Sequence, residues 1–124
     1  MAQPRFLFLY DRITAAGAAS GVRPAVSWRL LGANNRELGR SAATFPDLDS
    51  CLAAVRELVD GIAAATPSIS SVRERTGTWN WRLSLGDRAV AVAGRPYLRH
   101  RECTYNLAHF LAAVPEALVA AKQP

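Results

Sequence analysis

The chain has 124 residues, of which 50% are hydrophobic and 20% are charged, and its formal net charge at pH 7 is +5. These values are typical of one ordinary globular domain, and they exclude a long disordered or low-complexity chain. The first apolar run, residues 6–10, is too short for a secretory signal or a membrane span. We therefore expect a single domain over residues 1–124 that lies in the cytoplasm and away from membranes.

Three strands are predicted in the first part of the chain. Residues 5–10 are almost all aromatic or aliphatic, which favours a strand that is covered on both faces or lies at a subunit contact. A loop rich in Gly, Ala and Ser is expected over residues 11–24. Apolar residues alternate over 26–31 and predict a second strand with one apolar face. The asparagines at 34–35 tolerate a left-handed turn, so a hairpin into a third strand over residues 37–42 is expected.

A helix is predicted after these strands. It begins near Pro46 and Asp47, because the Asp47 carboxylate can accept hydrogen bonds from free backbone amides. Its core face is formed by apolar residues at helical spacing, namely Cys51, Val55, Leu58 and Ile62. Thr66 and Pro67 are expected to close the helix, since the residue before a proline avoids the helical region.

The second half of the chain repeats this plan with a shorter entry. A strand is predicted over residues 68–75, and a turn at 76–77 leads into a strand over residues 78–85. This second strand alternates cleanly, and the residues on its apolar face are Trp79, Trp81, Leu83 and Leu85. A turn at 86–88 then leads into a strand over residues 89–93.

A second helix is predicted over residues 99–114. Its core face consists of Cys103, Leu107, Phe110, Leu111 and Val114. Pro115 should break or kink the helix, because proline has no N–H to donate. Residues 116–121 are expected to resume as a short helical turn.

The two halves of the chain match each other in sequence. From the hairpin turn onward the offset is a constant 52 positions, which aligns Arg36 with Arg88, Phe45 with Tyr97, Cys51 with Cys103, Val55 with Leu107 and Leu58 with Phe110. We interpret this match as a tandem duplication, with repeat one over residues 1–67 and repeat two over residues 68–124. Each repeat would contain three strands and a helix.

Two such repeats predict an α+β fold. One antiparallel sheet would carry both helices on one face, with a pseudo-two-fold axis between the halves. Trp28 and Trp81 would be matched core anchors beneath the helices, since burying each of these side chains contributes on the order of 2–3 kcal/mol. Cys51 and Cys103 are expected to be reduced, packed thiols.

No catalytic constellation is found in the sequence. The two histidines, His100 and His109, would lie on opposite faces of one helix, and Glu102 and Cys103 are neighbours that do not face each other. Paired carboxylates, glycine-rich phosphate loops and metal-ligand spacings are not found in the sequence either. We therefore expect a protein that is not an enzyme and that has no catalytic residue, cofactor, metal or small-molecule substrate.

Arginine supplies almost all of the positive charge. In the two alternating strands, Arg29 and Arg82 lie on the face opposite the tryptophans, which is open if the helices cover one side only. Four more arginines lie near Tyr97 in the sequence. The candidate contacts for an anion or a protein partner are therefore Arg29, Arg82, Arg88, Arg95, Arg99 and Arg101. The same pattern is compatible with a solvated face on which arginine stems cover apolar surface.

The order of these residues resembles a known family. An aromatic-Arg-Leu strand, a polar turn, a short strand, an aromatic residue six positions before a cysteine and then a helix occur over residues 25–62 and 78–114. The match is clearest in the second half, at Trp81-Arg82-Leu83, Arg95, Tyr97 and Cys103. The pattern resembles the YegP-like family of small bacterial domains of unknown function. The resemblance implies tandem three-strand-plus-helix units, or two subunits, that share one sheet and exchange a strand. It implies no reaction, cofactor or catalytic residue.

Two functions fit these features. The leading hypothesis is a non-enzymatic protein-interaction module or homodimer, whose exposed edge strand or residues 6–10 recruit another chain. The alternative is a binder of nucleic acid or small anions that uses arginines on the open face of the sheet. No helix-turn-helix, zinc finger or RNA-binding sheet motif is found in the sequence to favour nucleic acid.

Overall fold

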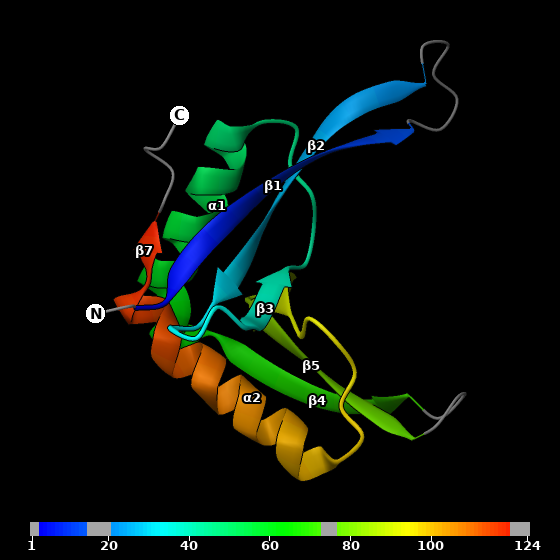
Figure 1. Ribbon diagram of the computed structural model, residues 1–124, viewed down its shortest axis with the longest axis vertical. Helices are drawn as coiled ribbons and strands as arrows, with labels where there is room; N and C mark the ends of the chain where they lie inside the picture. Colours follow the sequence, from blue (N-terminus) through cyan, green and yellow to red (C-terminus); the bar gives the residue numbers. More distant parts are fainter. Residues whose placement is uncertain (1–2, 15–20, 73–76, 120–124) are drawn as a thin grey trace.

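The computed structural model describes residues 3–14, 21–72 and 77–119. Within these ranges the chain forms one seven-stranded sheet with two helices packed against it, which confirms the predicted α+β class (Figure 1). The strands are β1 (Arg5–Thr14), β2 (Val22–Leu31), β3 (Glu37–Ser41), β4 (Thr66–Val72), β5 (Thr78–Leu85), β6 (Arg88–Val92) and β7 (Leu118–Val119). The helices are α1 (Leu48–Gly61) and α2 (His100–Ala113), followed by the 3₁₀ turns Ile62–Ala64 and Val114–Glu116. Neither helix in these ranges has the length and apolar character needed to cross a membrane.

The strand order in the sheet is β4-β5-β6-β3-β2-β1-β7. All neighbours are antiparallel except β7, which runs parallel to β1 beside Arg5 and Phe6. At the centre of the sheet β3 pairs with β6 at only two positions, Arg40–Val92 and Ser41–Ala91. This short junction is where the first and second halves of the chain meet.

Both halves place three strands and a helix in the same order, and the spacing of the helices is the same. α1 and α2 each have 14 residues and begin 52 positions apart, and the 3₁₀ turns have the same offset. Before each helix the chain makes an isolated antiparallel bridge, Val26–Phe45 in the first half and Trp79–Tyr97 in the second. The halves therefore share an order of elements, whereas the tandem repeat itself stays a prediction.

One apolar core lies between the helices and the sheet, with two tryptophans at its centre. Trp28 and Trp81 are each 1% exposed, which confirms both as core anchors. Phe110 of α2 contacts both, with ring centroids 6.3 Å from Trp28 and 4.8 Å from Trp81. Because Trp28 belongs to the first half and Phe110 to the second, this aromatic cluster joins the two halves.

Gly39 of β3 makes room for the aromatic cluster. A Cβ atom at this position would lie 2.7 Å from the Phe110 ring and 2.8 Å from the Trp81 ring. At the offset of 52, Gly39 corresponds to Ala91 and Phe110 corresponds to Leu58. The smaller strand residue therefore accompanies the larger helix residue, as close packing requires.

The helix starts follow local chemistry. Asp47 is the N-cap of α1, as predicted, and its carboxylate accepts a hydrogen bond of 2.7 Å from the Ser50 N–H. This hydrogen bond lowers the pKa of Asp47. Arg99 holds the same position before α2, where no side chain caps the helix.

Both cysteines are free and fully buried, as the sequence predicts. Burial raises the pKa of Cys51 from 9.0 to about 11 and also raises the pKa of Cys103. Both thiols are therefore protonated at neutral pH.

The N-terminal hairpin is longer than predicted. β1 continues to Thr14 and β2 begins at Val22, so the loop expected over residues 11–24 is wrong at both ends. Residues 15–20 of that loop lie outside the described residues. The two strands pair without a break, and their far ends project from the body as a two-stranded ribbon (Figure 1). Cross-strand hydrogen bonds here extend the strands into a segment whose composition favours a loop.

The first strand is not covered on both faces. Leu7 is 39% exposed because it lies opposite Arg29, on the sheet face without helices. Tyr10 is 66% exposed because the ribbon extends beyond the helices. The other half of that expectation, a strand that lies at a subunit contact, stays a prediction.

Two element ends also differ from the prediction. α1 ends at Gly61, and Thr66 and Pro67 begin β4 rather than closing the helix. Proline is tolerated there because β4 is an edge strand, where a missing N–H breaks no inner ladder. The predicted strand over residues 68–75 is described only to Val72, since residues 73–76 lie outside the described residues.

The helical turn expected over residues 116–121 is wrong. Glu116 ends a 3₁₀ turn, and the next apolar pair forms β7 beside the otherwise free edge of β1. Adding a strand to an open edge satisfies backbone groups that a short isolated turn of helix leaves to water. Residues 120 and 121 lie outside the described residues.

Candidate functional site

Three arginines form a row across the sheet face opposite the helices. Arg29 lies opposite Arg40 in the pairing of β2 with β3. Arg40 and Arg82 both lie opposite Val92 of β6, which stands between them. Arg29 and Arg82 therefore lie on the face that the sequence predicts for them.

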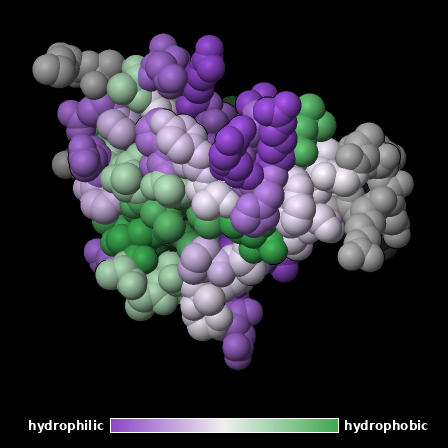
Figure 2. All heavy atoms as spheres, turned by 90° about the horizontal axis from the view of Figure 1, so that it is seen from below, coloured by the Kyte–Doolittle hydropathy of each residue, from purple (hydrophilic) through white to green (hydrophobic). Residues whose placement is uncertain are grey.

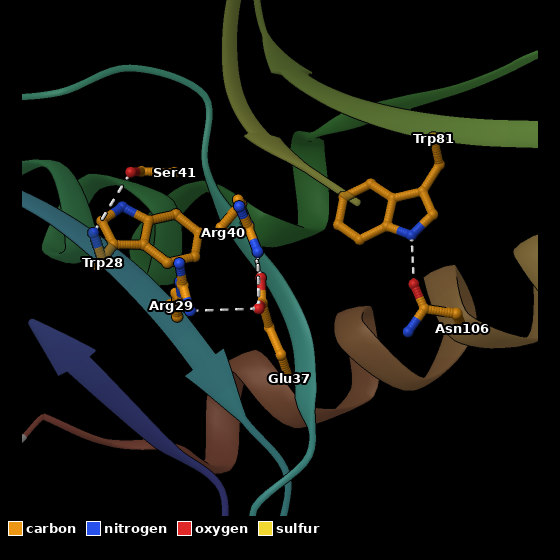
Figure 3. Close-up of polar contacts among 7 residues, drawn as sticks. All are labelled: Trp28, Arg29, Glu37, Arg40, Ser41, Trp81 and Asn106. Atoms are coloured by element: carbon orange, nitrogen blue, oxygen red, sulfur yellow. Dashed lines mark hydrogen bonds and ion pairs between the residues drawn. The ribbon is translucent and has the colours of Figure 1, made fainter. Parts of the chain in front are cut away.

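One acid, Glu37, lies within this row and pairs with two of its arginines. Arg40 donates two hydrogen bonds to the Glu37 carboxylate, at 2.6 and 2.8 Å, and Arg29 lies 3.8 Å from it (Figure 3). The hydrogen bonds raise the pKa of Arg40. Gly94 lies against the same carboxylate, since a Cβ atom there would collide with it. The open face thus holds its own anion, and in the row only Arg82 has no acidic partner among the described residues.

The other predicted arginines do not join this row. Arg88, at the start of β6, pairs with an acid of α1. Arg99 and Arg101 lie at the start of α2. Arg95 stacks over the Tyr97 ring, with its guanidinium carbon 5.1 Å from the ring centroid. The six predicted arginines are therefore divided among three places and form no single patch.

A wide groove lies between α2, the β2–β3 turn and the loop that leads into α2. We call it the α2 groove, and its volume is about 1030 Å³. Its polar and aromatic lining includes Arg36, Glu37, Arg95, Tyr97, Arg101, Glu102, Tyr105, Asn106 and His109. Two predicted arginines, Arg95 and Arg101, thus share a site with Arg36, which the sequence reasoning did not select.

Asn106 connects this groove to the core. It is only 9% exposed, and its Oδ1 accepts a hydrogen bond of 2.5 Å from the Trp81 indole N–H. An indole N–H can only donate, so the amide oxygen must face Trp81 and the Nδ2 group must point away, as Figure 3 shows. Nδ2 has no hydrogen-bond partner among the described residues, although every fully enclosed side-chain N or O atom in them has one. The groove therefore reaches Nδ2, which offers two free donors at its inner wall.

Positive groups outnumber free acids in the α2 groove. Its ionisable lining, apart from tyrosine, consists of Arg36, Arg95, Arg101, His109, Glu37 and Glu102. Glu37 is already bound by Arg40. Arg36 and Arg101 are exposed and have no ion-pair partner in the part of the chain that the structure describes. The groove is therefore suited to a negatively charged group.

Apolar surface lies beside these charges. Leu98 and Tyr105, which also line the groove, are each 74% exposed. Figure 2 shows that, on the face seen from below, apolar surface lies next to strongly hydrophilic side chains. A mixed surface of this kind, with exposed Tyr and Arg, is typical of protein contacts.

A smaller groove lies on α1. This α1 groove, of about 570 Å³, lies between α1 and the β5–β6 turn and is lined by Ala53, Arg56, Glu57, Asp60, Gly61, Leu85 and Arg88. Glu57 and Arg88 form an ion pair with each other. The basic and acidic side chains of the α1 groove balance in number, in contrast to those of the α2 groove.

A small pocket of about 290 Å³ opens on the sheet where β2 and β3 separate. Here the backbone N–H of Trp28 donates a hydrogen bond to Ser41 Oγ at 3.3 Å (Figure 3). The arginines that line the pocket, Arg29 and Arg40, are those held by Glu37. We therefore regard this pocket as part of the open face, where Glu37 pairs with both of its arginines.

The sequence reasoning missed several residues of the α2 groove, and one of them carries a readable signal. Asn106 lies three positions after Cys103, on the helix stripe that otherwise holds core residues. A polar residue at such a position needs a buried partner, and Trp81 supplies one. Arg36 and His109 have no comparable signal, because only the folded chain brings the first hairpin turn against the second helix.

Comparison with known proteins supports the fold. No protein-family model matches the chain, and no curated protein matches it in sequence. Among solved structures, the chain is similar to the solution NMR structure of yegP from E. coli, a protein of unknown function. The two share 11% sequence identity and a TM-score of 0.59 over 96% of this chain and 92% of that one. The chain therefore has a YegP-like fold, as the sequence resemblance implies.

Proposed function

We propose that the protein is a non-enzymatic interaction module that holds an acidic segment of a partner protein in the α2 groove. The observation that carries this proposal is the nearly buried Asn106 amide, whose oxygen is used by Trp81 and whose nitrogen faces the groove without a protein acceptor. Leaving a desolvated donor unpaired costs about 1–3 kcal/mol. A ligand that covers the groove must therefore bring an acceptor to this point.

The charges around Asn106 define the kind of acceptor. Arg36 and Arg101 are exposed arginines without a partner in the described chain, and guanidinium groups bind carboxylates in a bidentate manner. Leu98 and Tyr105 supply apolar contact area next to these charges. An extended peptide with acidic and apolar side chains matches both features.

A protein segment fits this groove better than a nucleic acid does. Glu37 and Glu102 are interspersed with the arginines of the lining, so the groove offers no continuous track of positive charge for a phosphate backbone. On the open face, which was the alternative site for nucleic acid, Glu37 already occupies Arg29 and Arg40. The arginine-mediated binding that the sequence predicts is therefore proposed for the groove, not for the sheet face.

Fluorescence anisotropy with a dye-labelled peptide of alternating glutamate and leucine tests this proposal. We expect binding that weakens with salt and that drops about tenfold in Arg101→Ala, since a charge-assisted hydrogen bond contributes about 1.5 kcal/mol. Arg82→Ala removes the same charge from the open face and should leave the affinity nearly unchanged. The proposal fails if the peptide does not bind, or if Arg101→Ala and Arg82→Ala weaken its binding equally. It also fails if a labelled oligothymidylate binds more tightly than the peptide.

A second candidate function, dimerisation, is favoured by the free edge of β1. β7 covers only Arg5 and Phe6, so beyond them the outer edge of β1 pairs with no other strand among the described residues. A second copy of the chain could add its own β1 there and extend the sheet. Light scattering should then report a dimer, and a Leu7→Lys, Tyr10→Lys double variant should be monomeric. A wild-type monomer at high concentration would exclude this dimer without affecting the groove proposal.

A further inference from the structure

The two grooves occupy equivalent places in the two halves of the molecule. Each lies between one helix and the hairpin turn of the other half, so α1 faces the β5–β6 turn and α2 faces the β2–β3 turn. At the offset of 52, Glu57 of α1 corresponds to His109 of α2, and Arg88 corresponds to Arg36. All four residues line their respective grooves. One groove can therefore serve as an internal template for the other.

The α1 groove shows which group this geometry accepts. Arg88, which follows the β5–β6 turn at the start of β6, donates a hydrogen bond to the Glu57 carboxylate of α1, although both side chains are largely exposed. The arrangement is thus a protein carboxylate held by an arginine at the mouth of a groove. Glu57 lies in α1 and Arg88 begins β6, so both residues of the pair belong to regular elements.

In the α2 groove the arginine is kept and the acid is replaced. His109 stands where Glu57 stands, and Arg36 forms no ion pair within the described residues. The main chain at Arg36 is fixed by the turn, because its backbone N–H donates to Asn34 Oδ1 at 3.0 Å and its carbonyl accepts from the Gly32 N–H at 2.8 Å. An arginine on this fixed turn, without the carboxylate that its counterpart binds, is the feature to be explained.

We propose that an acidic side chain of the bound partner takes, on Arg36, the place that Glu57 fills on Arg88. This inference rests on the proposed function and adds the ligand group, which is a single carboxylate from Asp or Glu, and the residue that anchors it. His109 matters because it leaves that place free of an internal acid. The free Nδ2 group of Asn106 then donates a hydrogen bond to a second oxygen of the partner, deeper in the same groove.

Restoring the missing acid tests this inference. In His109→Glu the new carboxylate should pair with Arg36 as Glu57 pairs with Arg88, and it should compete with the partner's acid. We expect the affinity for the glutamate–leucine peptide to fall at least tenfold, with no loss of thermal stability.

Ala108→Glu provides the matched control for charge. Ala108 is an exposed residue of the same helix turn that does not line the groove, so this variant adds the same carboxylate beside the site. Its affinity for the peptide should change much less than that of His109→Glu. Arg36→Ala should weaken binding of the peptide as much as His109→Glu does. The double variant should bind the peptide only slightly more weakly than either single variant.

The outcomes separate the two proposals. If the wild type does not bind the peptide, both fail. If the wild type binds and His109→Glu binds equally well, or if Ala108→Glu weakens binding to the same extent, the assignment of Arg36 fails while the groove proposal stands. A peptide in which each glutamate is replaced by phosphoserine should bind no more tightly, because the template is a carboxylate. Tighter binding of that phosphopeptide would overturn the ligand class.

Discussion

At the scale of single residues, Asn106 ties the stability of the core to the chemistry of the surface. Its oxygen completes the only hydrogen bond described for the indole N–H of a fully buried tryptophan, while its nitrogen faces the α2 groove. The oxygen and the nitrogen of one amide group thus have separate tasks. Substitutions that keep one of these atoms and change the other can distinguish the two tasks.

Replacing Asn106 should reveal both tasks. Asn106→Leu leaves the Trp81 N–H buried without an acceptor, so we expect the free energy of unfolding to fall by about 1–3 kcal/mol in urea titrations. Asn106→Asp keeps an acceptor for Trp81 but replaces the free donor by an oxygen. It should therefore lose less stability than the leucine variant and yet abolish peptide binding. Equal stability of the leucine variant and the wild type would contradict this account of the Trp81 bond.

The buried thiol of Cys51 should make stability depend on alkaline pH. Its pKa is about 11 in the folded chain and 9.0 in the reference state, so between these values the unfolded chain loses a proton that the folded chain keeps. The free energy of unfolding should therefore be unaffected by this group below pH 9 and should fall as pH rises toward 11. The measurement is the difference in pH dependence between the wild type and Cys51→Ala. A parallel course for the two proteins would refute it.

At the scale of elements, the two helices begin in different ways. α1 has Asp47 at its N-cap, whereas α2 has Arg99, which offers no acceptor and places a positive charge at the positive end of the helix. The equivalent positions thus carry a favourable and an unfavourable residue. The start of α2 lies next to the proposed binding groove, so its stability bears on how firmly the groove is formed.

Arg99→Ser should stabilise the protein. A serine at this position can accept a hydrogen bond from the free N–H groups of the first turn, and we expect the free energy of unfolding to rise by roughly 1 kcal/mol. The melting temperature should rise accordingly. Ala108→Ser, in the exposed middle of the same helix, is the control and should be neutral or slightly destabilising. No gain in Arg99→Ser over this control would show that the first turn is already satisfied.

Most elements could be predicted from the sequence, because their signals are local. The alternation in β2 and β5, the helical spacing after Asp47 and the left-handed Asn35 at the first hairpin are all properties of neighbouring residues. The ends of the first hairpin and β7 could not be predicted in this way. They depend on which strand edge is available, and that is decided by tertiary pairing.

At the scale of the whole molecule, the halves are interlocked, and this is why the candidate site was only partly predicted. Arg95 and Arg101 were selected for their charge, but Arg36 belongs to the other half and joins them only because α2 packs near the β2–β3 turn. Conversely, Arg29 lies on the predicted face and is neutralised by Glu37, which follows it by eight positions in the sequence. The alternation of residues along a strand predicts the face of the sheet on which a side chain lies. It does not predict the charged side chain with which that residue pairs.

The interlocking also predicts a coupled pair in the core. Gly39→Ala should destabilise the protein by about 1–3 kcal/mol, because its methyl group would collide with the Phe110 and Trp81 rings. Phe110→Leu, which introduces the residue found at the equivalent position of α1, should relieve part of this collision. A double-mutant cycle in urea should therefore show that the pair is more stable than the sum of the single changes predicts. Strict additivity would contradict the proposed fit.

The narrow junction between β3 and β6 has a mechanical consequence. Two residue pairs and the backbone hydrogen bond from Ala42 to Val90 are all that links the inner strands of the two halves, whereas β1 and β2 pair at ten positions. A force applied across the sheet should separate β3 from β6 first. The contacts of Trp28 and Trp81 with Phe110 should break at the same time. Because β7 of the second half also pairs with β1 of the first, the two hairpin-and-helix units should separate fully only once β7 has left that edge as well.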